Sequence, residues 1–245
     1  MELNKELYDR IQETAQTQVL KIGNKEYTTN KVHLVEDPIY KPEAFCLNTL
    51  CGICKMIKTE ISKIKERPLI VHVEDYNRVC VYTTYDDRFV RTALYHAVAD
   101  VPRVTFGSYQ PHESFMIELR SKYLRNEDTD YLLRLLASVV DENSVKTSDN
   151  GLSQKVEVQQ GITTIGTETV RPIVKLRPYR TFLEVEQPES EFLVRLQEGG
   201  KIALFEADGG MWKLEAKRNI ASFLAEELAE LEDMIGTSGS VIITE

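Results

Sequence analysis

Apolar residues recur at helical spacing at the start of the chain. From Glu2 to about Lys21 they follow one another at four-residue steps, at Leu3, Leu7, Ile11, Ala15 and Val19. This spacing is typical of an amphipathic helix with one apolar stripe. Between Gln18 and Val35 the pattern shortens to β-type segments around a Gly-Asn turn, so we expect short strands after the helix.

A second helix and a β-hairpin are predicted next. From Asn48 to Glu66 apolar residues recur at three- and four-residue steps, and Pro68 ends the helix. From Leu69 the period changes to two, and the run from Val79 to Tyr85 repeats it after a short polar turn. Such a pair of alternating runs indicates a hairpin. The stretch 86–111 fits neither period and stays unassigned.

Two further helices are expected at about 111–124 and 128–140. Pro111 suits the first turn of one helix, where its missing N–H costs nothing. Asp128 suits the start of the other, because its carboxylate can accept orphan backbone N–H groups.

The remainder of the chain is mostly β in pattern and ends in a helix. The polar cluster at 146–151 is the best candidate for a boundary. Extended runs follow, at 156–158, 173–186, 192–196 and 202–205. Pro178 lacks an N–H, so the second run must be an edge, a bulge or a bend at that point. Residues 211–235 carry a long helical stripe that Gly236 closes.

These clusters predict an α+β fold rather than regular βαβ alternation. Helices with a β-hairpin form the N-terminal half, and mostly antiparallel β closed by a long C-terminal helix forms the other. The domains expected are a mixed region at 1–145 and an antiparallel sheet with the C-terminal helix at 152–245, or one continuous domain.

Composition and charge exclude several classes. The 245 residues are 42% hydrophobic and 28% charged, which is ordinary for a globular protein. The net charge of −9 argues against a generic polyanion binder, and the segment 181–235 carries 13 acidic and 5 basic residues. No run approaches the roughly 20 apolar residues of a membrane span, and the opening MELNKELYDR is too polar for a signal peptide. We therefore expect a cytoplasmic protein without membrane contact.

No cofactor, metal or catalytic motif is predicted. The spacing of Cys46, Cys51, Cys54 and Cys80 resembles a plant-type iron–sulfur set and contains a C-x-x-C pair. Cys51 and Cys54 lie on an apolar helical stripe, however, so buried core cysteines are the preferred interpretation. Residues 205–210 are interpreted as a turn built by Asp208 and two glycines.

One basic, aromatic stretch stands out in this acidic chain. It contains Arg171, Lys175, Arg177, Tyr179 and Arg180. Such side chains can bind a phosphate or stack on a base. They can equally pair with acidic residues downstream, notably Glu184, Glu186, Glu189 and Glu191.

Two segments resemble phage sequences. The stretch LRPYRTFLEVEQPESEFLVRLQEGGKIALFEADGGMWKLEA, 176–216, resembles uncharacterised phage and prophage proteins of Gram-positive bacteria. The stretch HLVEDPIYKPEAFCLNTLCGICKMI, 33–57, resembles the opening of the YfdQ-like prophage family. The resemblance implies a phage gene expressed in the cytoplasm of the bacterial host, and it implies no activity.

Three functions follow as hypotheses. The first is a non-enzymatic phage protein that acts by homo-oligomeric self-assembly or partner binding. The second is accessory nucleic-acid binding in phage replication or recombination, through the basic stretch. The third is an enzyme whose residues meet only in three dimensions, such as His96 or His112 with Glu206 and Asp208.

Overall fold

The computed structural model describes residues 5–15, 19–22, 25–28, 43–64, 68–86, 89–138, 148–149, 154–159, 165–197, 200–235 and 241–245. By its contacts the chain divides into two compact units, Met1–Lys41 and Pro42–Glu245. The boundary predicted at 146–151 lies largely outside the described residues, and segments on both sides of it belong to the second unit. The division into 1–145 and 152–245 stays a prediction.

The first unit holds one helix and a hairpin. Helix α1 spans Lys5–Ala15, and strands β1 (Val19–Ile22) and β2 (Lys25–Thr28) pair antiparallel. The predicted helix therefore extends too far. Val19, which continues the four-residue stripe in the sequence, instead lies opposite Thr28 in the hairpin.

The first sheet of the second unit has the strand order β15-β4-β5-β6-β3. Its strands are β3 (Phe45–Leu47), β4 (Leu69–Asp75), β5 (Arg78–Thr83), β6 (Ala93–Val98) and β15 (Val241–Thr244). Strands β4 and β5 form the predicted hairpin, with Leu69 opposite Thr83. The two edge strands β15 and β3 pair parallel to their neighbours, and β6 occupies part of the unassigned stretch.

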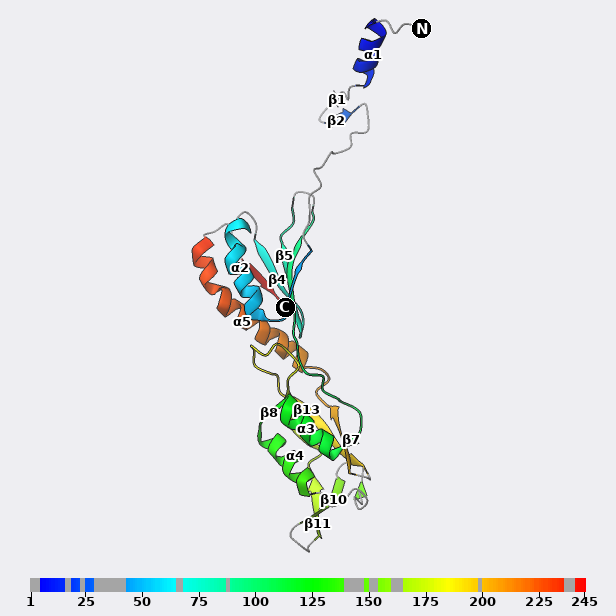
Figure 1. Ribbon diagram of the computed structural model, residues 1–245, viewed down its shortest axis with the longest axis vertical. Helices are drawn as coiled ribbons and strands as arrows, with labels where there is room; N and C mark the ends of the chain where they lie inside the picture. Colours follow the sequence, from blue (N-terminus) through cyan, green and yellow to red (C-terminus); the bar gives the residue numbers. More distant parts are fainter. Residues whose placement is uncertain are drawn as a thin grey trace. The chain divides into compact units, whose positions relative to one another are not determined.

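Two helices cover this sheet together. Helices α2 (Leu50–Ile64) and α5 (Trp212–Ile235) lie side by side on it (Figure 1). Each helix buries part of the apolar stripe that its sequence predicts against this sheet, whereas Cys51 of α2 and Leu214 of α5, also on those stripes, are exposed. The shared core contains Leu50, Ile53, Ile57, Val71, Val81, Ile220, Leu224 and Leu228. The C-terminal helix thus packs on elements of the N-terminal half.

A second, antiparallel sheet has the order β7-β14-β13-β12-β8. Its strands are β7 (Gln110–Pro111), β8 (Tyr123–Leu124), β12 (Ile173–Pro178), β13 (Ser190–Gln197) and β14 (Lys201–Glu206). The predicted pairing of 192–196 with 202–205 is confirmed. The extended run predicted to residue 186 ends at Pro178, as expected of a residue that cannot donate to a ladder.

Helices α3 (His112–Lys122) and α4 (Glu127–Ser138) pack against this second sheet. Its core contains Phe115, Leu119, Leu132, Leu135, Leu136, Val174, Leu176, Phe192 and Leu204. Strands β9 (Ser148–Asp149), β10 (Gln154–Gln159) and β11 (Ile165–Val170) form a smaller antiparallel sheet. The α+β class is confirmed, and within the described residues no helix is long and apolar enough to cross a membrane.

The start of α4 differs from the prediction. Asn126, not Asp128, caps the helix: Asn126 Oδ1 accepts the Thr129 N–H at 2.8 Å, and Thr129 Oγ1 accepts the Asn126 N–H at 2.8 Å. This reciprocal pair is a capping box with Thr in the place of Glu or Gln. Asp128 is free to face β12, where its Oδ2 accepts the Lys175 N–H at 2.7 Å.

Candidate functional site

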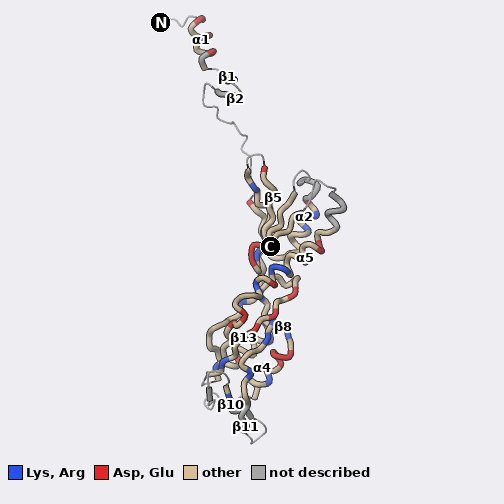
Figure 2. The backbone as a smooth tube through the Cα atoms, turned by 180° about the vertical axis from the view of Figure 1, so that it is seen from behind, with Lys and Arg blue, Asp and Glu red and all other residues tan. Residues whose placement is uncertain are grey.

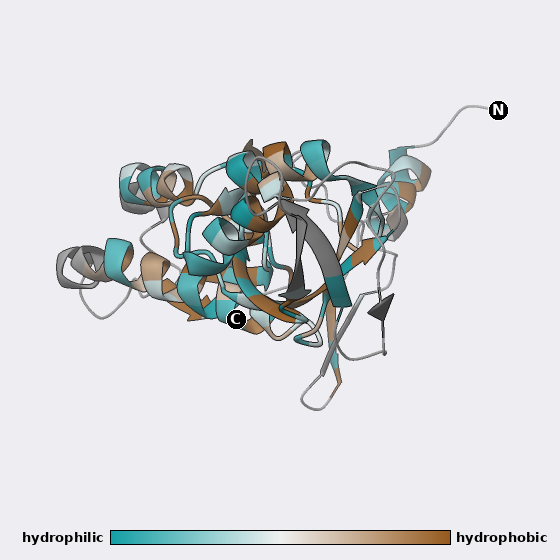
Figure 3. Ribbon diagram, turned by 90° about the horizontal axis from the view of Figure 1, so that it is seen from below, coloured by the Kyte–Doolittle hydropathy of each residue, from teal (hydrophilic) through white to brown (hydrophobic). Residues whose placement is uncertain are grey.

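One face of α1 carries apolar side chains that are exposed among the described residues. Leu7, Tyr8 and Ile11 are 52%, 57% and 53% exposed. Leu7 and Ile11 lie on this face together with Arg10 and Ala15. In Figure 3 the helix beside the N label carries both hydrophobic and hydrophilic positions. The stripe that the sequence predicts is present at these positions, and Leu3 lies outside the described residues.

The hairpin that follows α1 has the same character. Val19, Leu20 and Ile22 in β1 are all exposed large apolar side chains. Their exposed fractions are 63%, 47% and 65%. Isolated exposed apolar residues are ordinary, whereas contiguous ones mark interaction surfaces.

Three cations of the basic stretch are paired within the chain. Arg171 Nη1 lies 3.1 Å from Asp128 Oδ1, and Arg177 Nη1 lies 2.9 Å from Glu186 Oε1. The Lys175 ammonium lies 3.8 Å from Glu191. Figure 2 shows Lys and Arg interspersed with Asp and Glu along this part of the second unit. Pairing with acidic residues downstream therefore describes Lys175 and Arg177, whereas Arg171 pairs with Asp128 upstream.

Arg180 behaves differently, because it is buried. Its side chain is 6% exposed, its Nη1 lies 2.8 Å from Glu206 Oε1, and its Nη2 donates to Ser190 Oγ. The guanidinium carbon lies 3.8 Å from the centre of the Trp212 ring, a cation–π distance. Burial lowers the pKa of Arg180, and the Glu206 carboxylate opposes that shift. Arg180 thus connects Glu206, at the end of β14, with Trp212, at the start of α5.

Tyr179 and Arg180 are the two members of the stretch that share a cavity. A cleft of about 310 Å³ is lined by these two residues together with Tyr76, Trp212 and Lys213 among others. The Tyr76 and Trp212 rings meet edge to face with centroids 4.7 Å apart, and Lys213 lies 5.4 Å from the Tyr76 centroid. Arg171, Lys175 and Arg177 do not line it. The five residues therefore do not form one surface.

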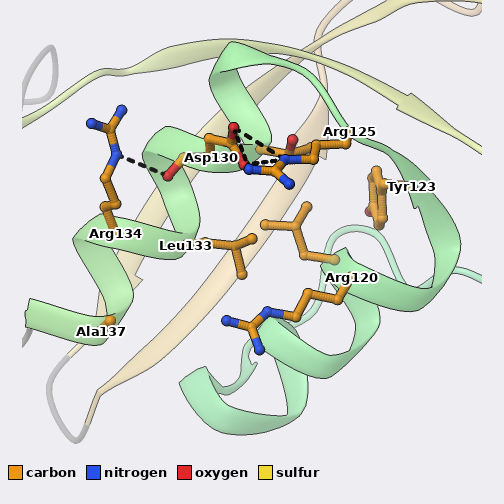
Figure 4. A pocket seen from close by; sticks show the side chains of 9 residues that line it. Arg120, Tyr123, Arg125, Asp130, Leu133, Arg134 and Ala137 are labelled. Atoms are coloured by element: carbon orange, nitrogen blue, oxygen red, sulfur yellow. Dashed lines mark hydrogen bonds and ion pairs between the residues drawn. The ribbon is translucent and has the colours of Figure 1, made fainter.

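A larger pocket lies between α3 and α4, with a volume of about 760 Å³. Three arginines line it: Arg120 from α3, Arg125 from the connection between the helices, and Arg134 from α4. In Figure 4 Arg120 extends toward Leu133 and Arg125 lies beside Asp130, whereas the Arg134 guanidinium is directed away from Arg120 and Arg125. The remaining lining consists of Leu119, Tyr123, Thr129, Asp130, Leu133 and Ala137. The pocket thus combines apolar walls with three cations and one carboxylate.

Asp130 orients two of these arginines. Arg125 Nε lies 2.9 Å from Asp130 Oδ1 and Arg125 Nη2 lies 3.2 Å from Oδ2, and this pairing raises the pKa of Arg125. Arg134 Nε donates to the Asp130 backbone carbonyl at 3.2 Å. Arg120 makes no hydrogen bond or ion pair within the described part of the chain. Helical spacing explains the Arg134 contact, because a carbonyl and a side chain four residues later share one face.

The cysteines are free, and only two of the four are buried. Cys54 and Cys80 are core residues as predicted, whereas Cys46 and Cys51 are exposed. Cys46 Sγ lies 3.0 Å from His96 Nε2, because strands β3 and β6 place the two residues side by side. Burial raises the pKa of Cys54 to about 12. Within the described residues no three His, Cys, Asp or Glu side chains converge as metal ligands.

The carboxylates of the enzyme hypothesis have other partners. Glu206 pairs with Arg180, and Asp208 Oδ1 accepts the Gly210 N–H at 3.0 Å. Gly209 and Gly210 have φ values of 63° and 83°, which glycine alone adopts readily. The prediction that 205–210 is a turn built by Asp208 and the glycines is confirmed. His96 pairs with Cys46 instead.

No protein-family model, curated protein or solved structure matches this chain. The resemblance to phage and prophage proteins therefore stays a prediction from the sequence.

Sequence reasoning missed the arginine pocket altogether. The three arginines, Arg120, Arg125 and Arg134, are five and nine residues apart and have acidic neighbours such as Glu127 and Asp128. The sequence therefore shows no cluster of basic residues that would indicate a site here. One signal was available: two predicted helices joined by a short connection pack antiparallel, which brings a residue near the end of the first helix opposite the second.

Proposed function

We propose that this chain is a non-enzymatic protein that acts by self-association, and that its first unit carries the contact. The single observation behind this proposal is the uncovered face of α1, with Leu7, Tyr8 and Ile11 each more than half exposed. Phage origin and a bacterial cytoplasmic location belong to the same proposal and rest on the sequence resemblances at 176–216 and 33–57.

A second copy of the chain is the occupant that the charges favour. Helix α1 carries Lys5 and Arg10 against Glu6, Asp9 and Glu13, so it is nearly balanced. Two such helices approach each other without the repulsion that a strongly acidic partner face would meet. A symmetric contact between identical patches is also the commonest form of association for soluble chains.

The expected strength is modest. Covering the rest of a half-exposed Leu or Ile contributes about 1 kcal/mol, and the loss of free motion on association offsets much of the sum. Association is therefore expected to depend on concentration. Light scattering coupled to size exclusion, over about 1 to about 200 μM protein, covers the range in which such contacts form.

The decisive variant is Leu7→Gln with Ile11→Gln in the full chain. We expect wild-type protein to show a mass that is a multiple of 28.1 kDa and the double variant to return to 28.1 kDa. The matched control, Glu6→Gln with Glu13→Gln, changes the polar positions of the same helix and should keep the wild-type mass. A wild-type monomer throughout the series, or an oligomer that the double variant leaves intact, contradicts the proposal.

Accessory nucleic-acid binding through 171–180 is supported less. Arg171, Lys175 and Arg177 already face carboxylates, and Arg180 is buried. Binding there requires these pairs to open. The ratio of absorbance at 260 and 280 nm across each chromatographic peak reports on bound nucleic acid in the same experiment.

A further inference from the structure

We propose that Cys46 and His96 form a site of thiol–disulfide exchange, at which Cys46 takes up a low-molecular-weight disulfide while His96 holds the thiol proton. The site lies in the first sheet of the second unit and does not depend on the self-association proposed for α1. Either proposal can therefore fail without the other.

The register of the sheet places the two side chains together. Edge strand β3 pairs parallel with β6, and Cys46 is the partner of His96 in that ladder. Tyr95 and Ala97, on either side of His96, belong to the core of this sheet, and Leu47 packs against the same core. Because side chains alternate between the two faces of a strand, His96 and Cys46 lie on the opposite face. Cys46 is exposed there, which gives a small reagent access to it.

The thiol and the imidazole converge on one proton. Cys46 Sγ lies 3.0 Å from His96 Nε2, which is a hydrogen-bond distance for a sulfur atom. Either the thiol donates to the neutral ring, or the protonated ring donates to the thiolate. Cys46 Sγ also lies 3.9 Å from the Ala44 carbonyl oxygen, too far to compete well for that proton. The thiolate is the nucleophile in disulfide exchange, and an adjacent imidazole favours its formation.

Among the four cysteines, all of them within the described residues, Cys46 alone combines exposure with a histidine partner. Cys54 and Cys80 are buried. Cys51 is exposed, but partial burial of its thiol and the nearby carboxylates of Glu184 and Glu227 raise its pKa and so disfavour the thiolate. Cys51 is therefore a matched comparison within the same chain.

Two groups suffice for this chemistry, whereas a metal centre needs more. A structural zinc site almost always takes four protein ligands. Within the described residues no third His, Cys, Asp or Glu joins the pair as a ligand. Cys80, which lies opposite His96 on β5, instead donates to Glu74 Oε2 at 3.4 Å. The geometry therefore favours thiol chemistry over metal binding.

The exchange is balanced by the two reactants themselves. The Cys46 thiolate attacks one sulfur of the disulfide, so that a new S–S bond forms at Cys46 while the S–S bond of the reagent breaks. The departing thiolate takes the proton that His96 holds. Cys46 is oxidised to a mixed disulfide, and the half of the reagent that leaves is reduced to a thiol, so no further oxidant is required.

The test follows the reaction of the full chain with bis(2-hydroxyethyl) disulfide at pH 7, by mass spectrometry of the peptides that contain Cys46 and Cys51. This probe is uncharged, so neighbouring charges act on the thiol rather than on the approach of the reagent. A charge-assisted hydrogen bond favours the thiolate by about tenfold or more, and the lower nucleophilicity of that thiolate offsets about half of this on a logarithmic scale. We therefore expect Cys46 to react at least about threefold faster than Cys51, and His96→Gln to slow Cys46 at least about threefold.

Two controls separate this role of His96 from a structural one. The rate at Cys51 should be unchanged in His96→Gln, because a loosened fold would alter both thiols. His72→Gln makes the same substitution at a histidine of the same sheet whose Nδ1 lies 2.9 Å from Thr244 Oγ1, and it should leave the rate at Cys46 unchanged.

Three results overturn the proposal: Cys46 reacting no faster than Cys51 in the wild-type protein, a rate at Cys46 that His96→Gln does not lower, or equal slowing by His72→Gln. The first of these needs no variant, so the proposal stays open to refutation even if His96→Gln fails to fold. Circular dichroism checks the fold of each variant.

Discussion

Replacing Arg180 by Ala tests whether the one buried cation of the basic stretch is structural. The side chain is 6% exposed, and three groups depend on it: Glu206, Ser190 and the Trp212 ring. The cation–π contact is worth about 1–2 kcal/mol when desolvated, and a hydrogen bond to a charged group about 1.5–3 kcal/mol. Because Glu206 is 42% exposed, it regains water when its partner leaves, which reduces the loss.

Removing a partner from a fully buried ion pair costs about 3–5 kcal/mol. With Glu206 partly hydrated, we expect Arg180→Ala to lower the free energy of unfolding by about 3 kcal/mol, at the low end of that range. Arg177→Ala is the matched control, because Arg177 and Glu186 are 37% and 68% exposed and such pairs contribute only about 0.2–1 kcal/mol.

Urea unfolding followed by circular dichroism measures both variants on the same scale. Trp212 is the single tryptophan of the chain, so its fluorescence gives a second signal from the site itself. The reasoning is refuted if the free energy of unfolding of Arg180→Ala lies within about 0.5 kcal/mol of the wild-type value. It is also refuted if Arg180→Ala unfolds at no lower urea concentration than Arg177→Ala. In that case Arg180 is available for a ligand rather than committed to the fold.

Three further predictions follow from local geometry. Asn126→Ala should lower the free energy of unfolding in urea by about 1–2 kcal/mol, because it removes the side chain that caps α4 by accepting the Thr129 N–H. A loss as small as that of a substitution at an exposed position contradicts the role of Asn126 as the cap. Burial raises the pKa of Tyr123, so its contribution to stability is fully present below the ordinary pKa of about 10 and is lost as the pH rises above it; Tyr123→Phe should therefore reduce the loss of stability at alkaline pH. Because the buried hydroxyl has no hydrogen-bond partner among the described residues, the same substitution should cost no more than about 1 kcal/mol in urea unfolding at neutral pH. A thiol reagent at pH 8 should modify the exposed Cys46 in the folded protein, whereas Cys54, which is buried and whose pKa is raised to about 12, should react only after unfolding. Mass spectrometry of the labelled peptides shows which cysteine has reacted before and after unfolding, and labelling of Cys54 in the folded protein contradicts the prediction.

Local patterns in the sequence determined most of the elements. Helices α2, α3, α4 and α5, the β4–β5 hairpin and the β13–β14 pair all lie where the hydrophobic period places them. These elements are predictable because their apolar residues repeat at 3.6 or 2 positions over many residues, and because proline and glycine end them. The turn at 205–210 is predictable for the same reason, since only glycine tolerates its backbone angles.

Gly52 shows a constraint that the sequence alone leaves unexplained. It lies inside α2, where glycine is usually unfavourable. A Cβ at this position would lie 2.8 Å from Thr49 Oγ1, and that oxygen accepts the Gly52 N–H at 3.2 Å. Glu184, from the distant 179–189 connection, accepts the Leu50 and Cys51 N–H groups of the same helix start. The helix N-terminus is therefore built from two parts of the chain.

The sequence by itself determined the class of fold and the apolar stripe on α1. For the basic stretch it left two alternatives, binding of a phosphate or base and pairing with acidic residues of the same chain. Tertiary structure decided which option each residue took: Arg177 meets Glu186 across a bend, whereas Arg180 turns inward onto Trp212. It also assembled the pocket of Arg120, Arg125 and Arg134 from two helices. The physical reason is that periodicity records which face of an element is apolar, while the pairing of charges depends on distances between elements that are far apart along the chain.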